Sequence, residues 1–145
     1  MSNGSHSSLV KPTLDTQFYI DFDWWKKHDS NWRIFLYDML CEKHHKVFEN
    51  QDEDVIIDYI DPETAEVKQV DGLLHTLMKH CAQLPDFISN STSLVATVFR
   101  VFLSNGNQKL SPWEIAEITG KSATKILRTF SGPRVFKGIR PYSRK

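Results

Sequence analysis

Residues 110–130 read LSPWEIAEITGKSATKILRTF, and this stretch decides the fold of the second part of the chain. Ser111 is followed by proline and then, three residues after the serine, by Glu114, which is the reciprocal pattern of a helix N-terminal capping box. Gly120 stands where a helix would end in a left-handed cap, a conformation that disfavours any side chain. Ser122 can then cap a second helix. The stretch therefore predicts two short helices joined by a glycine turn.

Apolar residues recur at helical spacing within this stretch and before it. The first short helix offers an apolar face of Ile115, Ala116 and Ile118, and the second offers Ile126, Leu127 and Phe130. Residues 91–102 predict another helix, whose inward residues are Leu94, Val95, Val98, Phe99 and Phe102. We expect that helix to pack beneath the pair as the first of three helices.

The spacing Ala116-x-x-x-Gly120-x-Ser122-x-x-x-Ile126 resembles that of helix-turn-helix DNA-binding proteins. In that family the small residue lets the two helices approach, and the aliphatic residue anchors the recognition helix. The resemblance implies that residues 122–130 form a recognition helix that contacts double-stranded DNA. It places these side chains on the outward face: Lys121, Ser122, Thr124, Lys125 and Arg128. The sequence departs from the family at Lys121 and Thr129, where apolar residues are common.

The segment after the second helix, residues 134–141, alternates apolar and basic residues. It is similar to the strand or wing of a winged helix-turn-helix domain, where such residues contact phosphates. The resemblance adds Arg134, Lys137 and Arg140 to the DNA-binding set. Over the whole chain, the runs FYIDFDWW, DPETAEV and ILRTFSGPRVFKGIRP are similar to a small uncharacterised bacterial family, which implies no activity.

The charges of the chain are divided between its two parts. Residues 105–145 hold nine Lys and Arg against two Glu, which gives 9 − 2 = +7. Residues 1–104 hold nine Lys and Arg against sixteen Asp and Glu, which gives 9 − 16 = −7. A basic part is the electrostatic footprint expected of a surface that binds a polyanion. The partition favours nucleic-acid binding, although the two parts could also neutralise each other within one fold.

The length of the chain suits one compact domain, or two small subdomains that share a core. Residues 1–13 are rich in Ser and Gly and predict a mobile tail. Residues 14–88 predict an acidic α+β subdomain, and residues 91–145 a basic subdomain like a winged helix-turn-helix. The expected fold class is α+β and mainly helical.

The acidic subdomain should contain a strand, a helix, a hairpin and a second helix. Alternating apolar residues over 18–25 indicate a short strand or extended segment. A helix is predicted over about residues 30–42, a β-hairpin over residues 55–70, and a helix that begins at residue 71 or 72. In this subdomain, the double tryptophan indicates one ring in the core and one on its edge.

Cysteine and histidine gather in two places in the acidic part. Cys41 and His44 form a Cys-x-x-His pair at a helix end, and His80 and Cys81 follow later in the chain. Two such pairs can complete a tetrahedral zinc site, and four protein ligands would make that zinc structural because no position stays open. The adjacent His80 and Cys81 lack the usual gap between zinc ligands. Cys81 also falls on an apolar stripe, where an inert buried thiol is the common outcome.

Several function classes find little support in the sequence. No nucleophile, glycine-rich phosphate loop or partner base accompanies Asp21 and Asp23, so we predict no enzyme. No apolar run is long enough for a membrane span, no signal peptide precedes the chain, and two cysteines in that setting indicate a reducing cytoplasm.

The expected function is a DNA-binding protein that regulates transcription, and a homodimer would suit a palindromic site. Two alternatives are a protein–protein interaction module built on the helical hairpin and a small zinc-binding accessory protein.

Overall fold

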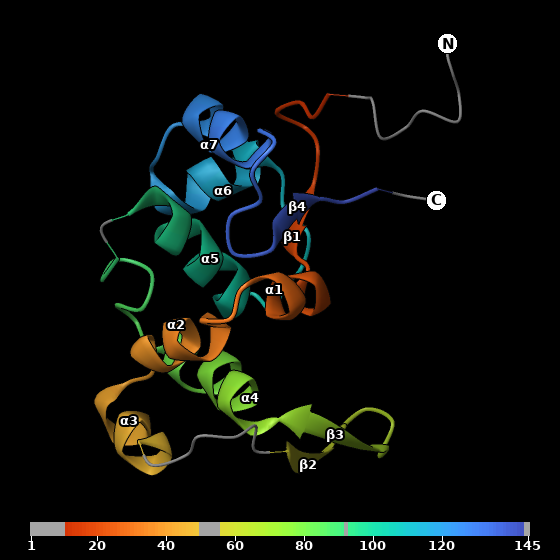
Figure 1. The fold of residues 1–145 in the computed structure, drawn as a ribbon, viewed down its shortest axis with the longest axis vertical. Helices are drawn as coiled ribbons and strands as arrows, with labels where there is room; N and C mark the ends of the chain where they lie inside the picture. Colours follow the sequence, from red (N-terminus) through yellow and green to blue (C-terminus); the bar gives the residue numbers. More distant parts are fainter. Residues whose placement is uncertain (1–10, 50–55, 92, 144–145) are drawn as a thin grey trace.

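The computed structural model describes residues 11–49, 56–91 and 93–143, in which the chain is a mainly helical α+β protein (Figure 1). The first elements are β1 (Phe18–Ile20), α1 (Phe22–His28), α2 (Trp32–Asp38) and α3 (Glu42–Phe48). The middle of the chain holds β2 (Ile56–Ile60), β3 (Val67–Asp71), α4 (Gly72–Lys79) and a short 3-10 helix (Cys81–Gln83). The last elements are α5 (Leu94–Ser104), α6 (Pro112–Thr119), α7 (Ala123–Phe130) and β4 (Ile139–Pro141). Residues 1–10 of the predicted tail lie outside the described residues.

The strands β2 and β3 form the predicted hairpin. They pair antiparallel with Ile60 opposite Val67, and the Asp61 N–H donates to the Glu66 carbonyl at 2.9 Å to close the turn. In Figure 1 the hairpin extends from the end of the molecule that lies opposite α7.

The strands β1 and β4 join segments that are far apart in the sequence. They pair antiparallel with Phe18 opposite Pro141, and the Phe18 N–H also donates to the Leu110 carbonyl at 2.8 Å. The Asn107 side chain bonds to the backbone of β1 at Ile20. Its amide oxygen accepts from the Ile20 N–H and its amide nitrogen donates to the Ile20 carbonyl, both at 2.9 Å. The chain between α5 and α6 therefore holds β1 in place.

The extended segment predicted over residues 18–25 is wrong in its second half, where the chain forms α1. The strand ends at Ile20 because the next residue, Asp21, caps a helix: its carboxylate accepts from the Trp24 N–H at 3.1 Å. Trp25 is fully buried and Trp24 is half-buried, which confirms the division of the two rings between the core and its edge.

The single helix predicted over residues 30–42 is two helices, α2 and α3. The last turn of α2 tightens, since the Met39 and Leu40 N–H groups donate to carbonyls only three residues earlier. Cys41 then adopts extended backbone, with φ −68° and ψ 163°, at the N-cap of α3. The break brings Cys41 to the start of a helix rather than to the end of one.

The helices α6 and α7 form as predicted. The Ser111 N–H donates to Glu114 Oε1 at 2.8 Å and the Glu114 N–H donates to Ser111 Oγ at 3.2 Å, which completes the capping box. Gly120 ends α6 with φ 74°, and Ser122 Oγ accepts from the Lys125 N–H at 3.2 Å to cap α7.

The apolar faces of these helices pack on the core except at Ile118, although Ala116 and Leu127 are only half-buried. Ile115, Ile126 and Phe130 are buried as predicted, whereas Ile118 is 51% exposed. The prediction for Ile118 is wrong because the packed face of this two-turn helix is narrower than its apolar spacing implies.

One hydrophobic core runs through both charge-divided parts of the chain. Buried residues of β1, α1, α2, α4, α5, α6, α7 and β4 all belong to it. At its centre the Trp25 ring meets Phe99 and Phe35 edge-on, with ring centroids 5.1 and 5.9 Å apart. Within the described residues, every helix is too short or too polar to cross a lipid bilayer.

Candidate metal centre and the exposed face of α7

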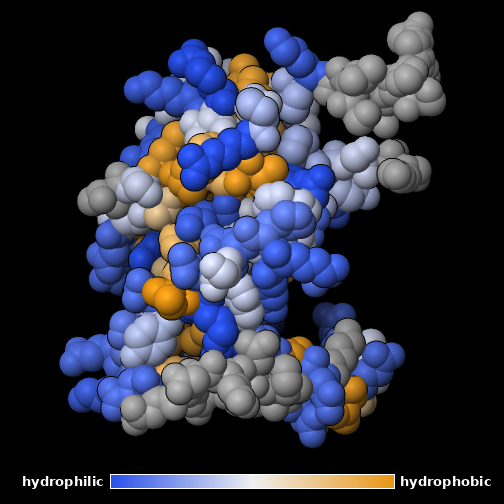
Figure 2. Space-filling model, in the orientation of Figure 1, coloured by the Kyte–Doolittle hydropathy of each residue, from blue (hydrophilic) through white to orange (hydrophobic). Residues whose placement is uncertain are grey.

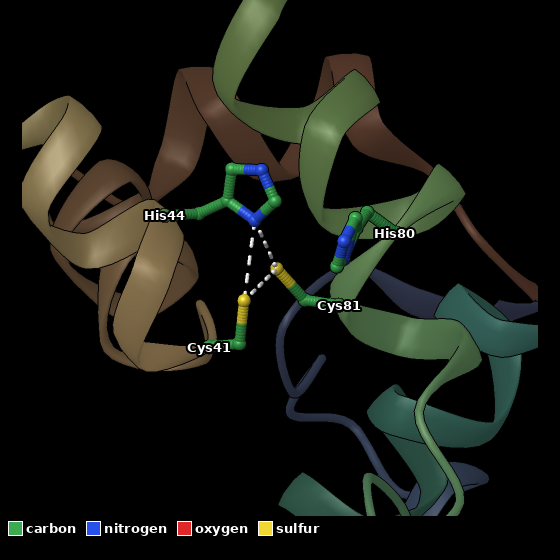
Figure 3. A group of neighbouring side chains, drawn as sticks. All are labelled: Cys41, His44, His80 and Cys81. Atoms are coloured by element: carbon green, nitrogen blue, oxygen red, sulfur yellow. Dashed lines mark hydrogen bonds between the residues drawn. The ribbon is translucent and has the colours of Figure 1, made fainter.

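Two helix ends bring two cysteines and two histidines together (Figure 3). Cys41 and His44 come from the N-cap and the first turn of α3. His80 and Cys81 follow α4, where His80 leaves helical geometry with φ −122° and ψ −67°. The helix ends before this adjacent pair, so both side chains can reach the same point despite the missing gap between them.

The ligand atoms of these four residues all lie within 4.8 Å of one another. Cys41 Sγ is 3.2 Å from His44 Nδ1 and 3.4 Å from Cys81 Sγ, and Cys81 Sγ is 3.5 Å from His44 Nδ1. A tetrahedral zinc ion, with bonds of about 2.3 Å to sulfur and about 2.0 Å to nitrogen, holds two sulfurs about 3.8 Å apart and sulfur and nitrogen about 3.5 Å apart. The cluster could hold a metal ion such as zinc after shifts of a few tenths of an ångström in Cys41, His44 and Cys81 and a larger inward movement of the His80 ring, because the four-atom set spans up to 4.8 Å.

Burial shapes the protonation of the cluster. It lowers the pKa of His44, which the neighbouring His80 and Lys43 lower further. Burial also raises the pKa of the Cys81 thiol to about 11. Without a metal ion the buried Cys81 thiol is therefore protonated at neutral pH. A metal ion would bind neutral imidazole directly and would displace the thiol protons.

A cavity of about 480 Å³ opens beside the cluster and is lined by both cysteines. Its lining carries three exposed carboxylates, Asp38, Glu42 and Asp86, against the single cation of Arg100, so the net charge around it is negative. Such a lining raises the local concentration of cations. The cavity provides an approach for a metal ion to the two sulfurs.

Two further histidines near these residues in sequence lie outside the cluster. The His45 ring packs on Tyr37, with ring centroids 4.5 Å apart. His75 lies one turn of α4 before the cluster, and its pKa is lowered by burial and by Lys79. In the sequence, the Cys-x-x-His spacing to Cys41 separates His44 from His45.

The polar face of α7 is open to solvent. Ser122, Thr124, Lys125 and Arg128 are exposed, and Lys121 is half-buried at the turn. Within the described residues none of the three basic side chains among them forms an ion pair. Figure 2 shows hydrophilic side chains over much of the end of the molecule where α7 lies.

The segment predicted to be a wing turns tightly and lies against α1. The Ile139 N–H donates to the Phe136 carbonyl at 3.0 Å, and Lys137 and Gly138 between them have φ 52° and 76°. A Cβ added to Gly138 would lie 2.7 Å from the Cβ of Trp25, and the Gly138 carbonyl accepts from the Asp21 N–H at 2.8 Å. The tip of this turn is therefore packed inside the protein.

Two of the three basic residues of this segment face carboxylates of the acidic part. Lys137 Nζ lies 3.6 Å from Asp29, and Arg140 Nη1 lies 3.3 Å from Asp21. The Asn31 backbone N–H, with the Trp25 indole and Lys137, holds the pKa of Asp29 below its usual value. Of the predicted wing residues, Arg134 alone stays exposed, with its guanidinium over the Phe136 ring at 4.9 Å.

The sequence missed one basic residue near α7. Lys11, in the predicted tail, lines a hollow of about 230 Å³ together with Thr124 and Arg128 of α7. No local pattern could have placed it there, because the contact depends on the path of the chain from β1.

No protein-family model matches this chain, and no curated protein or solved structure matches it either.

Proposed function

We propose that the protein binds duplex DNA through the exposed face of α7, with α5 and α6 supporting it as the other helices of a helix-turn-helix unit. The observation that carries this proposal is the set of polar side chains on and just before α7, whose basic members form no ion pair within the described residues and behind which Ile126 and Phe130 are buried. A helix fixed to a core on one face and polar on the other is suited to lie in the major groove.

The ion pairs of the turn after α7 remove two residues from the predicted DNA-binding set. Lys137 and Arg140 are held by Asp29 and Asp21, so phosphate contacts should come from other residues. The proposed contacts are Lys121, Ser122, Thr124, Lys125, Arg128 and Arg134. Each neutralised phosphate contributes a slope of about −0.9 to the dependence of log affinity on log salt.

A gel-shift series with a random duplex pool tests this proposal. Binding at low salt should weaken steeply as salt rises, and should fall in Lys125→Ala and Arg128→Ala. Lys27→Ala, which removes an exposed charge from α1, serves as the control and should bind like the wild type. Lys137→Ala should also keep most of its affinity. Absence of binding to the pool at low salt would reject the proposal, and a co-purifying protein would instead favour an interaction module.

We also propose that Cys41, His44, His80 and Cys81 bind one structural zinc ion. The observation that supports it is the convergence of the four ligand atoms within 4.8 Å. Such an ion would tie the start of α3 to the end of α4, and its binding free energy would add to the stability of the fold.

Elemental analysis of protein purified without chelator tests the zinc proposal. We expect one zinc ion per chain in the wild type and in His45→Gln, and less than one in His80→Gln and Cys81→Ser. A chelator should lower the melting temperature of the wild type. Zinc-free wild-type protein, or equal zinc in all variants, would reject the site.

A further inference from the structure

A hollow of about 230 Å³ lies between the chain at Lys11 and the solvent-facing side of α7. Its lining residues are Lys11, Pro12, Thr124, Leu127, Arg128 and Ser131. One ammonium and one guanidinium group thus line a single hollow together with two hydroxyls. Among the described residues that line it there is no carboxylate, which sets this hollow apart from the acidic cavity beside the metal cluster.

The α7 side of the hollow is fixed by helix geometry. Thr124 and Arg128 are one turn apart, so their side chains lie on the same face. Ser131, the C-cap of α7, lies at the end of that face, and the Ser131 N–H donates to the Leu127 carbonyl at 3.0 Å. The three polar side chains therefore stand on one well-ordered wall.

The opposite wall is held by hydrogen bonds near β1. The Thr13 N–H donates to Thr16 Oγ1 at 2.8 Å, and the Thr16 N–H donates back to the Thr13 carbonyl at 3.0 Å. The Tyr142 N–H then fixes the Gln17 carbonyl at 2.7 Å. These bonds, one of them from the C-terminal part of the chain, fix the segment that follows Lys11 in its path toward β1.

Two cations with hydroxyl donors and no acid are a suitable environment for a phosphate group. We propose that this hollow seats one backbone phosphate of the duplex, between Lys11 and Arg128. The inference rests on the proposed function, because α7 must meet DNA for a phosphodiester to reach it. The proposal thus assigns a DNA contact to Lys11, although Lys11 belongs to the part of the chain whose net charge is negative.

The salt dependence of duplex affinity tests Lys11 directly. Fluorescence anisotropy with a labelled random duplex pool would be measured at several salt concentrations for the wild type, Lys11→Gln and the charge-matched control Lys27→Gln. We expect Lys11→Gln to weaken duplex binding and Lys27→Gln to bind like the wild type, whereas the double variant Lys11→Gln/Arg128→Gln, which leaves the phosphate without a cation, should reduce the steepness of the log–log slope by about 1. The double variant Lys11→Gln/Arg128→Gln should lose less affinity than the sum of the single losses, because both cations hold the same phosphate.

Wild-type affinity in Lys11→Gln would overturn the phosphate seat while leaving DNA binding by α7 intact. If the wild type fails to bind duplex, the proposed function fails, and a titration with inorganic phosphate followed by NMR decides the seat separately. Shifts of the Thr124 and Arg128 amide signals that are lost in Lys11→Gln would support a phosphate site supplied by free phosphate. No such shifts would overturn the site itself.

Discussion

Replacing Gly138 by alanine tests the packing of the tight turn against α1. Gly138 has φ +76°, and an added Cβ would lie 2.7 Å from Trp25 Cβ and 2.9 Å from the Asp21 carbonyl oxygen. Neither atom is the end of a flexible side chain, so the backbone of the turn or of α1 must move. Gly106 provides a matched control, since it has φ +75° and nothing within 4 Å of its added Cβ.

The two substitutions share one cost and differ in another. Left-handed backbone costs a non-glycine residue about 1–2 kcal/mol, and both alanines incur it. Overpacking adds about 1–3 kcal/mol at Gly138 only. The free energy of unfolding should therefore fall by about 2–5 kcal/mol in Gly138→Ala and by about 1–2 kcal/mol in Gly106→Ala.

Urea unfolding followed by circular dichroism measures the difference. With a denaturant slope of about 2 kcal/mol per molar urea, the midpoint of Gly138→Ala should lie about 0.5–1.5 M below that of Gly106→Ala. Equal midpoints for the two variants would refute the close approach of the turn to α1.

Three further predictions concern other parts of the fold. Asn107→Asp should lower the free energy of unfolding by about 1–3 kcal/mol, because a carboxylate would face the β1 carbonyl that now accepts a hydrogen bond. The control Asn90→Asp, at an exposed position, should cost less in the same urea assay, and equal losses would contradict this role. The imidazole of His75 should titrate by NMR below the ordinary value of about 6.5, because burial lowers its pKa. Since the unfolded chain then takes up this proton first, stability should decline as pH falls through about 6.5, and a midpoint at or above that value would contradict the burial. The Cys41 and Cys81 sulfurs are 3.4 Å apart, so diamide should oxidise the metal-free protein to an intrachain disulfide, which mass spectrometry detects as a loss of two hydrogens. Protein saturated with zinc should resist this oxidation. Equal oxidation with and without zinc would count against the metal centre.

The parts of the fold that the sequence predicted are those with local causes. Ser111, Glu114, Gly120 and Ser122 act within four residues of themselves, and α6 and α7 form as their pattern indicates. The start of α1 illustrates a local conflict, because alternating apolar residues favour a strand while Asp21 is a good N-cap. Residues 22–28 form a helix because the helical conformation capped by Asp21 also places Trp25 in the core.

The parts that escaped prediction depend on contacts between distant segments. The carboxylate of Asp21 meets Arg140 from 119 residues away, and nothing near either residue marks the other as its partner. The division of charge along the sequence was correct as arithmetic, yet in space it is partly cancelled by the Asp29–Lys137 and Asp21–Arg140 pairs. For the metal centre, residue type indicated the four ligands. Their convergence depends on the break between α2 and α3 and on the end of α4, and the sequence did not predict that break.

The antiparallel pairing of β1 with β4 also determines how the protein would respond to a mechanical load. Residues 17 and 142 sit at the same end of the strand pair, where the Tyr142 N–H donates to the Gln17 carbonyl. Tension applied through these two residues would load the interstrand hydrogen bonds one after another, starting with that bond, instead of shearing them all together. Because each bond contributes only about 1 kcal/mol, the strands would peel apart at low force.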